Sequence, residues 1–120
     1  MSMSVTLLFL ALWVLSACAV DLGPRSSAAE LKKQGPPTVI KLDSDLHLDL
    51  PSRLSARPLE AESQWERVGE IPQGEVYRSL DSVLMLNSGN RHEAYLVMSG
   101  GNITGLYLPF EERFVEGTAK

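Results

Sequence analysis

The feature that most constrains the fold is a run of twelve residues, 39–50, in which aliphatic and polar side chains alternate. A period of two is the pattern of a β-strand that turns one face to a core and the other to water. The run therefore predicts one long strand, ended by Pro51, in an antiparallel sheet with a solvated face. The aliphatic side carries Ile40, Leu42, Leu46, Leu48 and Leu50, with Ser44 among them, and the polar side carries Lys41, Asp43, Asp45, His47 and Asp49.

Shorter runs toward the C-terminus also predict strands. Each is apolar or aromatic and is bounded by residues that favour turns, such as the Gly100-Gly101 pair, which is typical of a tight hairpin. The segment 110–114 predicts a last turn or an edge strand. The expected strands cover 75–79, 82–86, 92–98 and 103–108.

Together these patterns predict a mainly β domain over residues 39–120. We expect a small antiparallel sandwich or half-open barrel of five to six strands. Residues 59–68 contain several helix formers, which allows one short helix. A chain of 120 residues is one domain at most.

Charge and cysteine content argue against a nucleic-acid-binding protein and against a domain held together by disulfides. The formal net charge is -4, from 11 basic and 15 acidic residues, and no basic cluster is present that would meet the phosphates of a nucleic acid. Cys18 is the only cysteine, so the chain cannot form an intramolecular disulfide. We therefore expect no nucleic-acid partner and a domain that relies on its apolar core.

The N-terminal segment has the composition of an export signal. Residues 5–15 are apolar except for Thr6, and this run is shorter than the roughly 20 residues that a membrane span needs. Its length is that of the apolar region of a signal peptide, and small residues follow it. Directly after it stands Leu15-Ser16-Ala17-Cys18.

This tetrapeptide resembles the lipobox of bacterial lipoproteins. The resemblance implies cleavage between Ala17 and Cys18, removal of residues 1–17, and a lipid attached to the Cys18 sulfur that holds the mature protein to a membrane. Ala19-Val20 after the cysteine lacks the aspartate that retains such proteins in the inner membrane, which favours the periplasmic face of the outer membrane in a Gram-negative cell. The segment departs from the usual pattern in having no Lys or Arg before Arg25.

Residues 18–38 predict a lipidated N-terminus followed by a flexible linker. The segment is polar, lacks apolar periodicity and contains Gly23-Pro24 and Gly35-Pro36-Pro37. Ser27 and Glu30 are spaced as a capping box, so a turn or two of helix is the alternative.

Two groups of side chains are candidates for a chemical site. Asp45, His47 and Asp49 share one side of the alternating run, and His with carboxylates suits Zn²⁺ or Mn²⁺; the alternative is a solvated face that protects the sheet from edge pairing. His92-Glu93 with Ser79 or Ser99 shows no spacing that places a nucleophile. We therefore expect structural histidines, no enzyme and no cofactor.

Residues 74–109 resemble small proteins encoded on integrating conjugative elements, which favours a part in conjugative transfer. We accordingly expect a non-enzymatic lipoprotein that binds another envelope protein, with membrane lipid as its second partner through Cys18. The alternatives are a periplasmic inhibitor or small-ligand-binding lipoprotein, and a metal-binding module centred on His47.

Overall fold

The computed structural model describes residues 22, 23 and 25–119, and these form strands, turns and loops without a helix. Consequently no helix within this part of the chain is long and apolar enough to cross a membrane. The strands are β1 (Ser26–Ala28), β2 (Val39–Lys41), β3 (Leu48–Asp49), β4 (Ser55–Ala56), β5 (Gln64–Ile71), β6 (Gly74–Ser79), β7 (Leu84–Asn87), β8 (Arg91–Ser99), β9 (Asn102–Leu108), β10 (Arg113–Glu116) and β11 (Thr118–Ala119).

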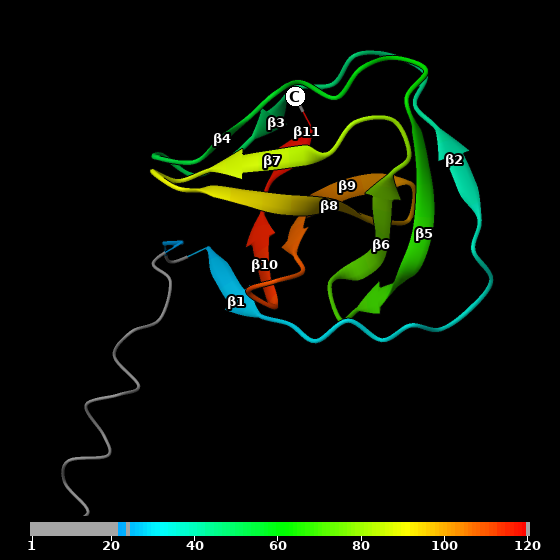
Figure 1. Cartoon of the computed structure of the whole chain (residues 1–120), viewed down its shortest axis with the longest axis horizontal. Helices are drawn as coiled ribbons and strands as arrows, with labels where there is room; N and C mark the ends of the chain where they lie inside the picture. The colour runs from blue at the N-terminus through cyan, green and yellow to red at the C-terminus, as the bar shows by residue number, and fades with distance from the viewer. Residues whose placement is uncertain (1–21, 24, 120) are drawn as a thin grey trace, which may run out of the picture.

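Nine of these strands form one antiparallel sheet, which does not close into a barrel (Figure 1). Its order is β1-β10-β9-β8-β6-β5-β2, and β7 pairs with β8 and β4 with β7. The remaining strands, β3 and β11, pair with each other. The expected mainly β, antiparallel fold is thus confirmed, whereas the expected five to six strands were too few.

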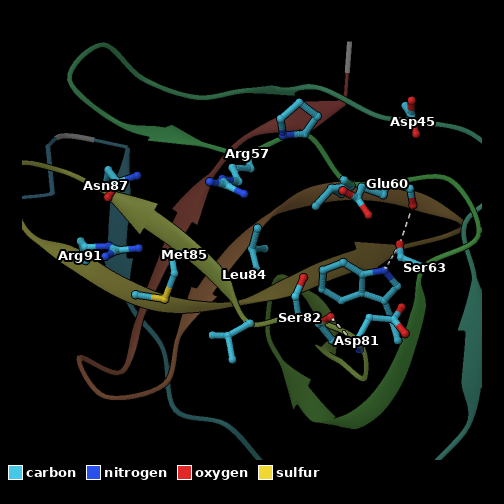
Figure 2. Close-up of a pocket in the computed structure, with 15 residues that line it drawn as sticks. Asp45, Arg57, Glu60, Ser63, Asp81, Ser82, Leu84, Met85, Asn87 and Arg91 are labelled. Carbon is cyan, nitrogen blue, oxygen red and sulfur yellow. Dashed lines mark hydrogen bonds between the residues drawn. The ribbon is translucent and has the colours of Figure 1, made fainter.

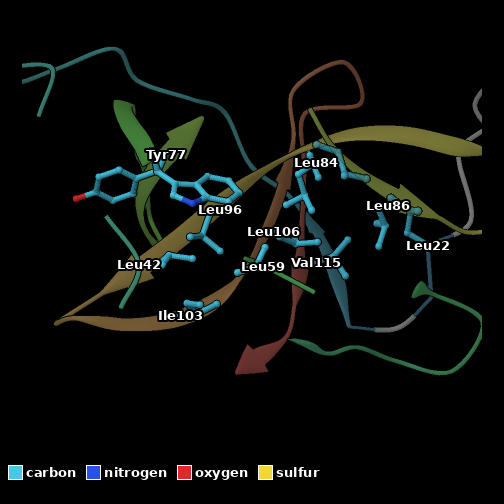
Figure 3. Close-up of a cluster of buried hydrophobic side chains, with 13 residues drawn as sticks. Leu22, Leu42, Leu59, Tyr77, Leu84, Leu86, Leu96, Ile103, Leu106 and Val115 are labelled. Carbon is cyan, nitrogen blue, oxygen red and sulfur yellow. The ribbon is translucent and has the colours of Figure 1, made fainter. Parts of the chain in front are cut away.

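Both faces of the central strands are buried, because neighbouring residues of a strand point to opposite sides. Leu96 and Val97 on β8, for example, are both fully buried but belong to different apolar clusters. Figure 3 shows the larger cluster, in which side chains from distant segments meet. It comprises Leu22, Leu42, Leu59, Trp65, Tyr77, Leu84, Leu86, Ala94, Leu96, Ile103, Leu106, Leu108 and Val115.

The smaller cluster explains why the expected linker does not stay free of the domain. It comprises Ala29, Ile71, Val76, Val97, Tyr107 and Phe114. Ala29 is buried in it and Leu31 packs against it, so the N-terminal segment covers this face of the sheet. On either side of that contact, β1 pairs with β10, and Lys32 and Glu70 exchange backbone hydrogen bonds of 2.9 Å. Leu22 is also buried. The prediction of a flexible linker, or of a helix at its capping box, does not hold for these residues.

The alternating run 39–50 forms two short strands in place of one long strand. Its first part, β2, pairs with β5, whereas β3 near its end pairs with β11. Because the two ends have different partners, the chain bends between them, and Leu46 forms a single bridge with Leu59. The aliphatic side chains of the run still contact the larger cluster, so the alternation correctly predicted which residues face the core.

The possible helix at 59–68 is also absent. The second half of the segment, from Gln64 on, belongs to β5, which pairs with β2 on one side and with β6 on the other. Hydrogen bonding to two neighbours and the burial of Trp65 outweigh the small helix preference of Leu, Glu and Ala. The strands expected at 75–79, 82–86, 92–98 and 103–108 correspond to β6, β7, β8 and β9, with shifts at their ends.

The tyrosines give the fold an expected sensitivity to alkaline pH. Burial raises the pKa of Tyr77, Tyr95 and Tyr107 above 10.0, because desolvation disfavours the charged tyrosinate. A folded-state pKa above the unfolded value means that this stability is present below about pH 10 and is lost as the pH rises through the folded-state pKa. We expect the urea midpoint to fall in that range, with a smaller fall for Tyr107→Phe. An equal fall of the urea midpoint in the wild type and in Tyr107→Phe would contradict a contribution from the Tyr107 hydroxyl.

Candidate functional site

The sequence-predicted site residues fall into two groups. Ala17 and Cys18, the expected cleavage and lipidation site, lie outside the described residues. Asp45, His47 and Asp49 lie within them, but they do not converge: Asp45 Oδ1 accepts a hydrogen bond of 2.7 Å from the Ala61 amide, and Asp49 is in β3. No three His, Cys, Asp or Glu side chains in the part of the chain that the structure describes are placed to hold a metal ion. The proposed metal ligands are therefore not brought together.

A cleft of about 570 Å³ opens where β4 leaves β7. The two strands pair only through Ser55↔Asn87 and Ala56↔Leu86. Pro58 has no amide hydrogen with which to extend this ladder. The following residue, Leu59, instead exchanges backbone hydrogen bonds of 2.8 and 2.9 Å with Leu46. The chain after β4 therefore diverges from β7 and leaves a space beside it.

The cleft has an apolar floor and one exposed apolar side chain. Trp65, Leu59 and Leu84 line it and are buried, whereas Val83 is 63% exposed. The indole Nε1 of Trp65 donates a hydrogen bond of 2.9 Å to Ser63 Oγ, which fixes the ring (Figure 2). An apolar floor with its polar group already satisfied favours contact with apolar parts of a ligand.

Two carboxylates at the cleft stabilise the loop that borders it. Asp45 accepts the Ala61 amide, and Asp81 Oδ2 accepts the Gln64 amide at 2.8 Å. Both side chains thus satisfy backbone donors that no strand partner satisfies. Their first role is structural, and it gives the 60–64 segment a fixed position.

Two arginines at the cleft have no such structural role. Arg57 and Arg91 line it and are exposed, and neither guanidinium group makes a hydrogen bond or ion pair with any residue that the structure describes. Arg78, by contrast, pairs with Glu66 at 3.1 Å. Figure 2 shows Arg57 and Arg91 toward one end of the cleft, with Asn87, and Glu60 and Asp81 toward the other. The cleft therefore has a cationic end available to an anion.

A second constellation was missed from the sequence. Ser88 Oγ lies 2.9 Å from His92 Nε2, and His92 Nδ1 lies 2.7 Å from Glu111 Oε2. His92 is 7% exposed, and the Glu111 side chain is 18% exposed. The signal that could have found it is the alternation of His92, Ala94 and Leu96, which all lie on a buried side of β8, where a polar ring needs partners. Ser79 and Ser99, the serines that the sequence offered as its neighbours, do not contact it.

Comparison with known proteins finds no matching family model, no similar curated protein and no similar solved structure. The cleft and the Ser88 constellation are therefore interpreted from their own geometry and chemistry.

Proposed function

We propose that this protein is a lipid-anchored lipoprotein of the bacterial cell envelope that binds an extended segment of a partner protein in the cleft beside β7. The observation that carries the proposal is the open edge of β7. Leu84 and Met85 line the cleft, and on that side of β7 the pairing with β4 stops at Leu86. An unpaired strand edge is a template for the backbone of another chain.

The side chains of the cleft support a peptide as the occupant. Backbone hydrogen bonds to the edge of β7 would supply affinity for any extended segment, and pockets for alternate side chains would supply selectivity. The apolar floor around Trp65 suits one such side chain. Arg57 and Arg91 suit a carboxylate, which guanidinium groups bind through paired hydrogen bonds. The segment we propose therefore has an apolar residue near Trp65 and an acidic residue or carboxyl terminus near the arginines.

A lipid anchor at Cys18 would hold the domain that carries this cleft near a membrane. Leu22 is buried in the larger apolar cluster and comes four positions after Cys18 in the chain. A chain of that length spans at most about 14 Å. A lipidated protein would thus be held close to the lipid surface, at the periplasmic face of the outer membrane in a Gram-negative cell. Its role there is assembly of an envelope complex, and conjugative transfer is the process that the likeness of residues 74–109 favours.

Site-specific photocrosslinking in intact cells tests the proposal. A photoreactive amino acid replaces Val83 at the cleft or, as the matched control, Val39, which is 52% exposed on β2. We expect irradiation to give one discrete adduct with an envelope protein from position 83 and none from position 39. Mass spectrometry of the adduct should locate the contact in an extended segment of the partner.

A charge reversal makes this test more specific. Arg57→Glu should reduce the yield of the position 83 adduct at least about tenfold, because losing a charged hydrogen bond and adding a like charge costs more than about 1.4 kcal/mol. Arg53→Glu is the control, because Arg53 is exposed but does not line the cleft. Equal adducts at positions 83 and 39, or no adduct at position 83, would refute binding at the cleft.

A further inference from the structure

We infer that Ser88, His92 and Glu111 form a nucleophilic serine site that cleaves carboxylic esters. This site is distinct from the cleft. Asn87 and Arg91 line the cleft, whereas Ser88, His92 and Glu111 are not among its lining residues. The inference therefore stands apart from the proposed binding function and adds an activity to it.

The connections between the three side chains assign a role to each. A carboxylate accepts but does not donate, so the 2.7 Å contact with Glu111 requires the proton of His92 on Nδ1. Nε2 is then free to accept, and the 2.9 Å contact is a hydrogen bond donated by Ser88 Oγ. Ser88 is thus the nucleophile, His92 its base and Glu111 the group that orients the ring.

The sheet register explains why these residues meet. Tyr95 pairs with Tyr107, and extending this antiparallel register along β8 brings residue 110 opposite His92. The turn between β9 and β10 therefore lies beside His92 and presents Glu111 to it. On the other side, β7 pairs Leu86 with His92, and the chain immediately turns through Ser88. The site is built on the ends of paired strands, which hold the three groups in place before any substrate binds.

Two features of the turn between β9 and β10 cost folding free energy, which a purely structural contact would not explain. Glu111 Oε1 is buried and has no hydrogen-bond partner among the described residues, which costs about 1–3 kcal/mol. The next residue, Glu112, adopts a left-handed backbone with φ of 52°, a conformation that side chains other than glycine rarely take. Unsatisfied groups and backbone strain of this kind concentrate at functional sites.

The turn that carries Ser88 has room and donors for a substrate. Gly89 has φ of +96°, and a Cβ placed there would meet no atom within 4 Å. The amides of Gly89 and Asn90 have no hydrogen-bond partner in the described part of the chain, and both residues are exposed. Backbone amides that follow a nucleophile are a common source of donors for the oxygen that becomes negative during acyl transfer.

The reaction balances without a cofactor. Ser88 Oγ attacks the carbonyl carbon of the ester, and its proton passes to His92 Nε2. The bond between the carbonyl carbon and the alcohol oxygen then breaks, and the alcohol leaves with the proton from His92. Water, deprotonated by His92, attacks the acyl-serine; the carboxylic acid leaves, and the proton returns to Ser88 Oγ.

A serine-directed fluorophosphonate probe tests the site in the full-length protein as cells produce it. We expect a covalent adduct that peptide mass spectrometry maps to Ser88. Ser88→Ala should abolish the adduct, and Ser99→Ala, which removes an exposed serine from the neighbouring hairpin, should leave it unchanged. Likewise, Ser88→Ala should abolish the hydrolysis of p-nitrophenyl butyrate, and Ser99→Ala should leave it unchanged. No adduct on Ser88 in the folded wild-type protein, or equal hydrolysis by Ser88→Ala, would overturn the inference.

A substitution at Glu111 distinguishes a catalytic role of this site from a purely structural one. Glu111→Gln keeps the size of the side chain but removes the charge that stabilises a protonated His92, so labelling should slow about a hundredfold or more. A merely structural contact would change the melting temperature and leave the labelling rate of the folded protein unaltered. If Glu111→Gln does not fold, the comparison of Ser88→Ala with Ser99→Ala still tests the inference. Ser88 lies in a surface turn, so its replacement should not prevent folding.

Discussion

Replacing Cys18 with serine is expected to move the protein from the membrane fraction to the soluble fraction of broken cells. Serine cannot form the thioether through which a lipoprotein carries its lipid, and each buried CH₂ of that lipid contributes about 0.8 kcal/mol to membrane binding. With several acyl chains lost, the change should be nearly complete. Fractionation followed by immunoblotting measures it, and intact mass spectrometry of the wild-type protein should show a chain that begins at lipidated Cys18.

The control for this prediction is Ser16→Ala, which keeps a small residue near the cleavage site. It should be processed and fractionate like the wild type. If Cys18→Ser still pellets with the membranes and has the same mature mass as the wild type apart from the substituted atom, the lipoprotein assignment is wrong. The cleft could then still bind its partner, because the photocrosslinking at Val83 is an independent test.

Gly105→Ala is expected to be the most destabilising of the small substitutions in the sheet. A Cβ at this position would overlap the Val115 carbonyl oxygen and lie 2.8 Å from a ring carbon of Phe114. The carbonyl belongs to the ladder between β9 and β10 and cannot retreat without breaking it. We expect a loss of about 3 kcal/mol in the free energy of unfolding, measured by urea denaturation.

The matched control is Gly100→Ala in the turn between β8 and β9. A Cβ there meets no atom within 4 Å, but the backbone has φ of +58°, so the substitution should cost only about 1–2 kcal/mol. Equal losses at the two positions would mean that β10 does not lie against β9, because the close approach at Gly105 exists only in that pairing.

Local pattern was sufficient for the hairpins of the C-terminal half. The strands β6, β8 and β9 follow from short apolar runs, and Gly100-Gly101 predicts the turn between two of them. All the information that such a hairpin needs lies within about 20 residues, because its strands are partners of each other.

Local pattern failed where the partner of a segment lies far along the chain. The 39–50 run has the alternation of one strand, but its two ends pair with β5 and with β11. No local feature of the run predicts either partner. Residues 22–32 resemble a linker because they are polar and contain turn-forming residues. They are held to the domain because the sheet has a second apolar face that Ala29 and Leu31 cover.

Period and closely spaced turn residues were enough to predict the mainly β class, the C-terminal hairpins and the side of the 39–50 run that contacts the core. The two candidate sites, in contrast, depend on contacts between segments that lie far apart along the chain. Arg57 and Arg91 line the same cleft because β4 and β8 both lie next to β7, and Glu111 reaches His92 because β8 pairs with β9 in one particular register. Such meetings depend on strand order and register, which long-range packing sets.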